Sequence, residues 1–323
     1  MRTFINKTLY TVFMLFIISV ISFLAINAAP HSFLSAGNLN PNITPEALER
    51  LEEIYGLNKS LFDQYISWLG SIVTLDFGVS FTSGKDVSDE ILARLPITLF
   101  MNITGMVLIF FLSIYLGVTS ALKNSPTYEE NVKRISLISF AFPGFYLAIL
   151  LVLIFSYYFS VFPINGLHSQ GVSKESFWLY YTDMLWHLAL PIFVIVFGGF
   201  GSLTLYIRSL TKEIIKSDYY FFAKARGLSS KLIRRRYVYP NLAPPIITML
   251  GLSLPALIGG SVILETIFAI DGMGLLFYNS ALSRDYPVIM GILIIGAFLT
   301  LLGNIIADTV LLLLNPYFKK AKS

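Results

Sequence analysis

Two acidic residues, Glu265 and Asp308, stand in or beside long apolar runs of the sequence. A charge is costly in such a setting, so a functional role is the first hypothesis for each. Glu265, followed by Asp271, could line a path for a solute and bind a cationic group on it. Equally, Glu265 could cap or bridge neighbouring helices, and Asp308 could pair with a nearby cation or a helix backbone. Gly272 and Gly274 close by suit a hinge, a short re-entrant turn or a simple loop.

A second candidate site is the stretch 211–241, which is rich in Lys and Arg and lies between two apolar runs. Gly227 follows a helical run, where a left-handed C-terminal cap is expected, and Ser229 can begin a second helix. The stretch therefore predicts two short helices that meet at a tight corner. Phe221, Phe222 and Leu228 give this corner an apolar tip amid positive charge, which suits insertion into a groove of a partner. The alternative is a basic segment that is merely retained on the cytoplasmic side, or an interfacial helix.

Motifs for catalysis or nucleotide binding are missing from the sequence. It has no GxxxxGK[ST] loop to cradle phosphates, no HExxH pair to hold zinc and no GxSxG turn to expose a serine nucleophile. His31, His168 and His187 are too scattered for a helix-spaced metal pair, and there is no cysteine. The sequence therefore predicts neither an enzyme nor a metal site, and no cofactor in this chain.

The elements that carry the candidate residues are predicted to be transmembrane helices. Hydrophobic residues make up 55% of the 323 positions and charged residues 13%, with a mean hydropathy of +0.72, which is far from a soluble composition. A helix needs about 20 apolar residues to cross a bilayer. We therefore expect an all-α membrane protein, embedded in lipid, with six transmembrane helices over 8–29, 97–122, 135–160, 187–209, 241–267 and 288–314. A signal peptide is the alternative for the first run, although its apolar core would be only about 7 to 15 residues long.

Positive charge predicts the orientation of these helices. Of the 23 Lys and Arg residues, 17 lie in the N-terminal tail, in 123–134, in 208–240 and in the C-terminal tail. Both termini are therefore expected in the cytoplasm. The net charge of +4 indicates membrane orientation, and no nucleic-acid partner is expected.

The chain divides into four segments on this pattern: a tail and first span at 1–29, a polar extracytoplasmic insert at 30–96, a five-helix core at 97–314 and a cytoplasmic tail at 315–323. The insert, with nine acidic and four basic residues, is expected to contain helices at 44–56, 61–69 and 87–94 and a β-like or irregular stretch to Phe81. Within the spans, Gly198 with Ser202, and Ala256 with Gly260, are spaced for close helix approach.

Several short motifs carry a resemblance to a known family. In the basic stretch they are Asp218-Tyr219, Ala223, Ala225-x-Gly227-Leu228 and Pro240-Asn241. Elsewhere they are Leu75-Asp76-Phe77-Gly78-Val79-Ser80-Phe81, Arg94-Leu95-Pro96, Gly259-Gly260, Glu265-Thr266-x-Phe268, Gly272-Met273-Gly274 and Arg284-Asp285-Tyr286-Pro287. With these motifs the chain resembles, over nearly its whole length, a permease subunit of the bacterial ABC importers that take up dipeptides, oligopeptides and nickel complexes. It departs from the family pattern at Phe221-Phe222, at Tyr239 before Pro240, and at Asp271, where the family usually has proline.

The resemblance implies a permease-like bundle of the type I ABC importers in the bacterial cytoplasmic membrane. The partners that it implies are a second homologous permease, two cytoplasmic ABC ATPases and an extracytoplasmic solute-binding protein, with ATP and Mg²⁺ in the ATPases. The residues expected to couple this chain to the ATPases are Asp218, Phe221, Phe222, Ala223, Gly227, Leu228 and Pro240.

The most detailed of these expectations concerns the substrate. The stretch 75–81 and the opening Thr44-Pro45-Glu46 of the insert resemble the nickel and metal-chelate branch somewhat more than the peptide branch, so the sequence favours a metal chelate, with peptides as the alternative. Bare Ni²⁺ is not expected as the solute, because imidazole is scarce and thiolate absent. The alternative from another class is an ion-coupled secondary transporter, with Glu265 and Asp308 as an ion relay. The basic corner and the absence of inverted halves argue against it.

Overall fold

The computed structural model describes residues 13–24, 60–74, 76–254 and 262–314, with the side chains of 307–308 and 310–314 excepted. These residues form helices and connecting loops, and their only β pairing is an isolated antiparallel bridge between Val79 and Asp86. The expected helix at 44–56, His31, the pair Ala256 and Gly260, and the side chain of Asp308 lie outside this part of the chain.

Three helices in the described part are long and apolar enough to cross a membrane. They are α5 (Val87–Leu122), α8 (Phe177–Ile215) and α14 (Tyr286–Leu314). At 1.5 Å per residue, α5 is about 54 Å long, well beyond the roughly 30 Å of a hydrocarbon core. These three helices confirm the spans expected at 97–122, 187–209 and 288–314. A shorter apolar helix, Phe13–Leu24, lies within the first expected span.

The helix α5 differs from its prediction at its start. The sequence suggested a separate helix at 87–94 that ends before Leu95-Pro96, whereas α5 runs without a break through Pro96. A proline inside a helix removes one backbone hydrogen bond, which membrane helices tolerate when neighbours hold the backbone in line. Val87 and Ile91, both completely buried in a hydrophobic cluster with Phe77 and Tyr286, hold this part of the helix in place.

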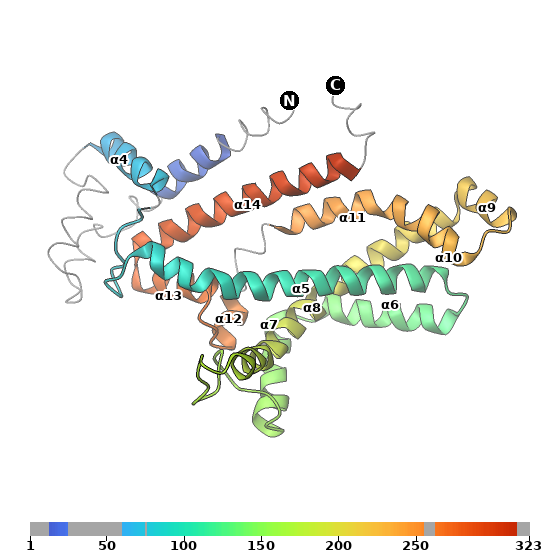
Figure 1. Cartoon of the computed structure of the whole chain (residues 1–323), viewed down its shortest axis with the longest axis horizontal. Helices are drawn as coiled ribbons and strands as arrows, with labels where there is room; N and C mark the ends of the chain where they lie inside the picture. Colours follow the sequence, from blue (N-terminus) through green and yellow to red (C-terminus); the bar gives the residue numbers. More distant parts are fainter. Residues whose placement is uncertain (1–12, 25–59, 75, 255–261, 315–323) are drawn as a thin grey trace.

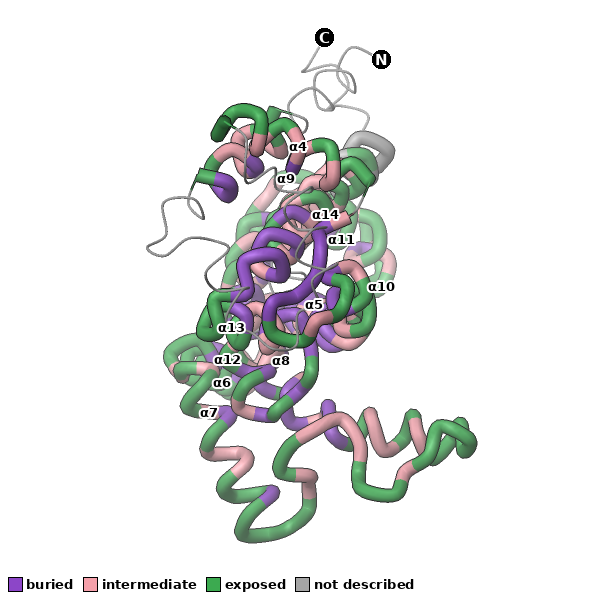
Figure 2. Tube along the Cα trace, turned by 90° about the vertical axis from the view of Figure 1, so that its left-hand side faces the viewer, coloured by how far each residue is buried: buried purple, intermediate pink, exposed green. Residues whose placement is uncertain are grey.

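The span expected at 135–160 is not one straight helix. The helix α6 (Pro126–Ala141) is followed by α7 (Gly144–Leu151) and a π-helical segment, η1 (Val152–Tyr158), after a bend of 96°. Pro143 explains the bend, because proline disfavours helical backbone in the residue before it, and Phe142 is extended with ψ 121°. The arm that begins with α7 therefore projects sideways from the bundle (Figures 1 and 2).

The span expected at 241–267 is described only at its two ends, since residues 255–261 lie outside the described part of the chain. Its described parts are α11 (Tyr239–Ser253) and α12 (Val262–Ile267). A short helix, α13 (Met273–Ser283), then leads into α14. The remaining helices are α4 (Leu61–Val73) in the insert and, at the opposite end of the molecule, α9 (Asp218–Ala225) and α10 (Ser230–Ile233), followed by π-helical η2 (Arg234–Val238) (Figure 1).

Glycines set the close packing of the central helices. A Cβ on Gly117 of α5 would lie 2.8 Å from Ile207 Cγ2 on α8, and one on Gly201 of α8 would lie 2.3 Å from the carbonyl oxygen of Ser136 on α6. The prediction for Gly198 and Ser202 is wrong, since a Cβ on Gly198 would meet nothing within 4 Å and Ser202 is exposed. The sequence spacing identified the right helix but the wrong face of it.

Candidate functional site

The basic stretch forms the predicted corner at one end of the molecule. The helix α9 ends in a Schellman motif, in which Gly227 has a φ of +73°, its N–H bonds the carbonyl of Lys224, and the N–H of Leu228 bonds that of Ala223. Ser229 then caps α10 by accepting a hydrogen bond from the N–H of Leu232 at 3.4 Å. Both capping predictions are confirmed.

The apolar tip of the corner consists of two phenylalanines. Phe221 and Phe222 are 66% and 63% exposed, and their rings lie edge to face with centroids 6.0 Å apart. Ala223, by contrast, is buried, and Leu228 is half-buried. The two phenylalanines are therefore available for a contact, whereas Ala223 supports the corner from inside. Asp218 and Pro240 are exposed at the starts of α9 and α11, and their expected role in coupling stays a prediction.

The corner is joined to the bundle by an apolar cluster. Ile207 and Ile214 of α8 pack in it with Val238 of η2 and Leu242 of α11, and all four are buried. Tyr220 of α9 packs against the same cluster. The helix α9 is therefore in packing contact with the cluster that joins α8, η2 and α11.

A charged clamp beside the corner was not found from the sequence. Glu129 Oε1 of α6 accepts hydrogen bonds from both Arg208 Nη2 and Lys212 Nζ of α8. One carboxylate thus ties the first turn of α6 to two successive turns of α8. The sequence contained a clue, because Arg208 and Lys212 are four residues apart and so share one face of a helix.

The opposite end of the molecule brings together motifs that are far apart in the sequence. Asp285, which is 1% exposed, accepts hydrogen bonds from Ser80 Oγ at 2.6 Å and from the backbone N–H groups of Phe81 and Thr82, both at 3.0 Å. The motifs at 75–81 and 284–287 therefore form one structural unit. We call this unit, together with the Arg94 and Glu265 contacts described next, the outer frame, because the distribution of Lys and Arg predicts that this end is extracytoplasmic.

Arg94 makes the second connection of the outer frame. Its Nε donates to Asp271 Oδ1 at 2.6 Å, and its Nη1 donates to the carboxylate and the carbonyl of Glu90. Asp271, expected beside the solute path, is thus paired with Arg94, while its side chain remains 64% exposed. The place of Asp271 in the path stays a prediction.

Glu265 makes the third connection and lies completely inside the protein. It is 0% exposed, accepts a hydrogen bond from Thr98 Oγ1 at 3.0 Å, and accepts another from the N–H of Leu275 at 2.9 Å. Thr98 Oγ1 in turn accepts from the N–H of Met273. These bonds satisfy N–H groups in the first turn of α13, where negative charge is also favourable. The geometry favours the capping alternative for Glu265 over that of a solute ligand.

The two positions near Glu265 are glycines because a side chain there would not fit. A Cβ on Gly272 would lie 2.6 Å from both Glu265 Oε2 and Thr98 Oγ1, and a Cβ on Gly274 would lie 2.9 Å from Glu265 Oε2. Neither glycine has a positive φ. They allow the carboxylate to approach the backbone, so the hinge interpretation of this segment is not needed.

His168, in the loop before α8, and His187 of α8 lie near one acid, Asp183 of the same helix. Asp183 accepts hydrogen bonds from Ser169 N and Oγ, and it lies 3.3 Å from His168 Nδ1 and 3.7 Å from His187 Nε2. In the described ranges, no three or more His, Cys, Asp or Glu side chains are arranged so that they could hold a metal ion. His187 hydrogen-bonds Ser169 Oγ and the carbonyl of Gly166. His168 lies beside the same acid, a grouping that the sequence separation of the two histidines had concealed.

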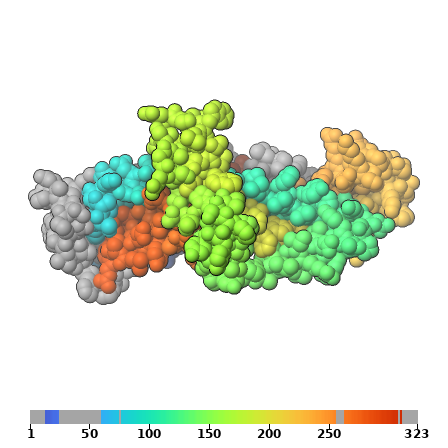
Figure 3. Space-filling model, turned by 90° about the horizontal axis from the view of Figure 1, so that it is seen from below, coloured from blue at the N-terminus to red at the C-terminus, as the bar shows by residue number. Residues whose placement is uncertain are grey.

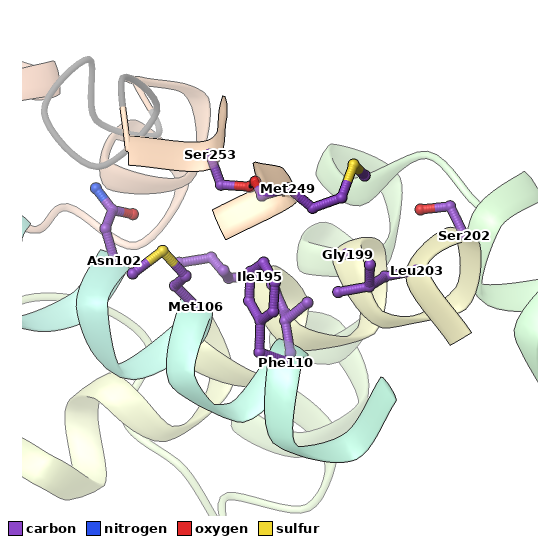
Figure 4. A pocket seen from close by; sticks show the side chains of 10 residues that line it. Asn102, Met106, Phe110, Ile195, Gly199, Ser202, Leu203, Met249 and Ser253 are labelled. Atoms are coloured by element: carbon purple, nitrogen blue, oxygen red, sulfur yellow. Dashed lines mark hydrogen bonds between the residues drawn. The ribbon is translucent and has the colours of Figure 1, made fainter. Parts of the chain in front are cut away.

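Between the corner and the outer frame, three helices line a half-open cavity of about 290 Å³. Figure 4 shows the side chains of α5, α8 and α11 that surround it. Among the residues that line it are Asn102 and Met106 of α5, Gly199 and Ser202 of α8, and Met249 and Ser253 of α11. No sequence motif marked this cavity.

Comparison with known proteins identifies the family. The family described as binding-protein-dependent transport system inner membrane component matches residues 113–320, and the corresponding N-terminal family matches residues 1–102. The oligopeptide transport system permease protein AppB of Bacillus subtilis is 35% identical over 313 residues, 97% of each chain. The metal-staphylopine import system permease protein CntB of Staphylococcus aureus is 29% identical over 308 residues, 95% of this chain and 93% of CntB.

A solved structure supports the fold independently. A chain of the MetNI methionine ABC transporter, crystallised in inward-facing conformations, matches with a TM-score of 0.52 at 15% sequence identity. The match covers 70% of this chain and 96% of that one. Together with the family match, this confirms the permease-like bundle of the type I ABC importers. The chain belongs to the family of inner membrane components of binding-protein-dependent transport systems, as a permease subunit of the ABC importers for peptides and nickel complexes.

Proposed function

We propose that this permease forms a path for oligopeptides across the bacterial cytoplasmic membrane together with a second, homologous permease. The observation that supports coupling to a motor is the exposed pair Phe221 and Phe222 on a corner that packs into the bundle. Two cytoplasmic ABC ATPases, which bind ATP and Mg²⁺, would receive this corner. Both termini would lie in the cytoplasm, as the distribution of Lys and Arg indicates.

Transport would follow alternating access. Closure of the ATPase dimer would move α9 as a rigid body, and the buried cluster of Ile207, Val238 and Leu242 would carry that movement into α8 and α11. ATP and solute would bias an existing equilibrium between inward-open and outward-open states. An extracytoplasmic binding protein would deliver the solute to the outer frame.

Peptides are the substrate class that the relatives favour. AppB, at 35% identity, is named as an oligopeptide permease, and an OppB of Haemophilus influenzae with the same kind of name is 30% identical. The preference of the sequence for a nickel or metal chelate is not confirmed. It remains as a second candidate function, because CntB, named for metal-staphylopine import, is 29% identical over 95% of this chain.

The test is uptake by the complete complex in proteoliposomes. We expect ATP-dependent accumulation of labelled oligopeptides that a metal chelate does not compete away. Accumulation of the chelate alone would favour the second candidate. Accumulation by this chain without ATPases, driven by an ion gradient, would contradict both and support a secondary transporter.

A further inference from the structure

The helix α4, in the segment that the sequence predicts as a polar insert, packs against the helix Phe13–Leu24. Trp68 is 1% exposed, and its ring centroid lies 5.6 Å from that of Phe23. The hydroxyl groups of Tyr65 and Ser19 lie 2.8 Å apart and share a hydrogen bond. Because Phe13–Leu24 lies within the first expected span, these contacts place α4 beside a membrane helix.

A second side of α4 carries an apolar stripe that is largely exposed. The stripe consists of Phe62, Ile66, Leu69 and Val73, which follow one another at spacings of four, three and four and so share one side of the helix. Phe62 is 72% exposed and Val73 80%. A continuous apolar surface of this kind marks a contact with another protein or with lipid.

The side of α4 that points away from the stripe is polar. Asp63, Ser67 and Ser71 follow one another at spacings of four, and Asp63 is exposed. Ser71 Oγ donates to the carbonyl of Ser67 at 3.3 Å. A helix with one polar and one apolar side suits the boundary between water and lipid, where it lies with its apolar side toward the acyl chains.

The stripe continues into an apolar groove between α4, the helix Phe13–Leu24 and α14. Leu69 and Val73 form part of its wall, with Phe16 of the first helix and Phe298 of α14. Among the described residues that line the groove, only Ser19 is polar, and its hydroxyl already has hydrogen-bond partners. The groove therefore offers hydrocarbon contacts and no free polar group.

The groove lies at the depth of the acyl chains. Ile294 and Phe298, which line it, are about 12 Å and 18 Å along α14 from Tyr286, where this helix begins. The hydrocarbon core is roughly 30 Å thick. Figure 1 shows α4 at the same end of the molecule as α13, so the groove belongs to the half of the core that is nearer the outer frame.

The volume of the groove suits a long hydrocarbon chain. An apolar cavity of about 150 Å³ stays dry and can take up a molecule as large as benzene. The groove, at about 600 Å³, is four times that size and is open on one side. It therefore has room for a longer apolar ligand, and its open side gives a lipid access from the bilayer.

The side chains of the stripe favour lipid over a second membrane helix as its neighbour. Helices that pack against each other within a membrane use small residues for close approach, or polar side chains that bond across the contact. Phe62, Ile66, Leu69 and Val73 provide neither. The apolar surface also runs on to the exposed rings of Phe16 and Phe298, so it joins the surfaces that the two membrane helices present to the bilayer.

We propose that α4 lies in the outer leaflet of the membrane with its stripe against lipid, and that an acyl chain of a phospholipid fills the groove. The proposal does not depend on which solute is transported. It changes the role of the insert, because α4 then anchors this segment to the membrane. The polar side of α4 and the outer frame are left to face an extracytoplasmic partner.

Spin labels test where the stripe lies. The sequence contains no cysteine, so single labels can be attached at Ile66→Cys and Val73→Cys on the stripe and at Asp63→Cys on the polar side. Phe298→Cys is the reference that faces lipid, and Lys85→Cys, at an exposed position of the insert, is the reference in water. Collisions of each label with oxygen, which concentrates in lipid, and with water-soluble chromium oxalate are measured in the complete complex in proteoliposomes, with cysteine-free partner subunits.

We expect the labels at Ile66→Cys and Val73→Cys to resemble the one at Phe298→Cys. Their ratio of oxygen to oxalate collisions should be several-fold higher than the ratio at Asp63→Cys. Few collisions with either reagent would show that another part of this chain or the second permease covers the stripe, and frequent collisions with oxalate would show that it faces water. Either result would overturn the proposal. If one stripe variant does not assemble, Phe62→Cys replaces it.

A larger side chain tests the occupant of the groove. Ile295→Trp adds bulk to the groove wall, whereas Leu302→Trp adds the same side chain to α14 at a position that is 42% exposed and outside the groove. We expect native mass spectrometry of the complex to show one phospholipid fewer per permease for Ile295→Trp and the wild-type number for Leu302→Trp. If Ile295→Trp does not assemble, Val73→Trp replaces it.

An unchanged number of lipids in Ile295→Trp, or an equal loss in both variants, would contradict an acyl chain in the groove. Neither the collision rates nor the lipid count depends on transport. Failure of the proposed function would therefore leave both results unaffected, and failure of this proposal would leave ATP-dependent uptake by the wild-type complex intact.

Discussion

At the residue scale, buried carboxylates organise the outer frame. Asp285 accepts three hydrogen bonds from 80–82, and Glu265 caps α13. The sequence analysis singled out Glu265 because of its apolar surroundings, and it stated the capping alternative. Its partners could not be predicted, because Thr98 and Leu275 are brought to it only by the packing of α5, α12 and α13.

The cap at Glu265 can be tested with Glu265→Gln. The substitution keeps the shape but replaces one acceptor oxygen with an NH₂ group, which would face the donors of Thr98 or Leu275. An unsatisfied buried donor costs about 1–3 kcal/mol. We therefore expect a lower thermal midpoint of the purified protein in detergent, measured beside Asp271→Asn as an exposed control.

The same variant separates the cap from a solute ligand. If Glu265 only caps α13, the complex that does assemble should show the wild-type half-saturating peptide concentration for uptake. An unchanged thermal midpoint together with a large rise in that concentration would show that Glu265 binds solute instead.

At the element scale, hydropathy predicted well where long apolar helices occur, but it did not predict the directions in which the helices run. Hydropathy located α5, α8 and α14, because each contains an apolar run long enough to cross a bilayer. It could not reveal the 96° bend after α6, since apolar residues continue on both sides of Pro143. It also ended a helix at Pro96, where contacts of Val87 and Ile91 with distant segments keep α5 continuous.

The ion pairs of Glu129 with Arg208 and Lys212 are predicted to stabilise the packing of α6 against α8. Ion pairs at a surface are worth about 0–1 kcal/mol, and Arg208 is only 18% exposed, so we expect Glu129→Gln to lower stability by about 1 kcal/mol. Double-mutant cycles with Lys212→Met should show coupling between the two side chains. Additive effects of the two substitutions would show that the clamp contributes nothing as a pair. Glu130→Gln, whose partner Arg134 is exposed on α6, is the matched control.

The exposed tip of the corner is predicted to bind the partner ATPase. Phe221 and Phe222 are exposed, so Phe222→Ala should leave the thermal midpoint of the isolated permease unchanged. It should weaken co-purification of the ATPases by about tenfold or more, as expected when a buried aromatic anchor is lost from an interface. Phe111→Ala, on α5, provides a control of similar exposure. Normal ATPase binding by Phe222→Ala would place the contact elsewhere.

At the scale of the whole molecule, the corner and the outer frame lie at opposite ends of one bundle. Figure 3 shows the segment of α9 and α10 at one end of the long axis and the segment of α13 near the other, with the sideways arm between them. The corner, the cavity and the outer frame are joined through the long helices α5 and α8. This arrangement suits a protein that converts a push at one end into an opening at the other.

The three parts of the site were not equally predictable. The corner is contiguous in the sequence, and Gly227 and Ser229 have recognisable capping roles, so it was predicted in detail. The motifs of the outer frame were visible, but not that Ser80 meets Asp285. The cavity was missed, because Asn102, Ser202 and Ser253 are separated by about 150 positions and are unremarkable one by one.

The central claim is that an ATP-driven motor acts on this permease at the corner, and Gly227→Val tests it most directly. Valine at a φ of +73° is strained by about 1–2 kcal/mol, and the corner is expected to deform, whereas Gly227→Asn tolerates this backbone and serves as the control. The measurement is the ratio of peptide taken up to ATP hydrolysed by the complete complex in proteoliposomes. We predict wild-type membrane insertion for both variants, with a ratio at least tenfold lower for Gly227→Val and near wild type for Gly227→Asn. An unchanged ratio in Gly227→Val at normal expression would contradict the claim.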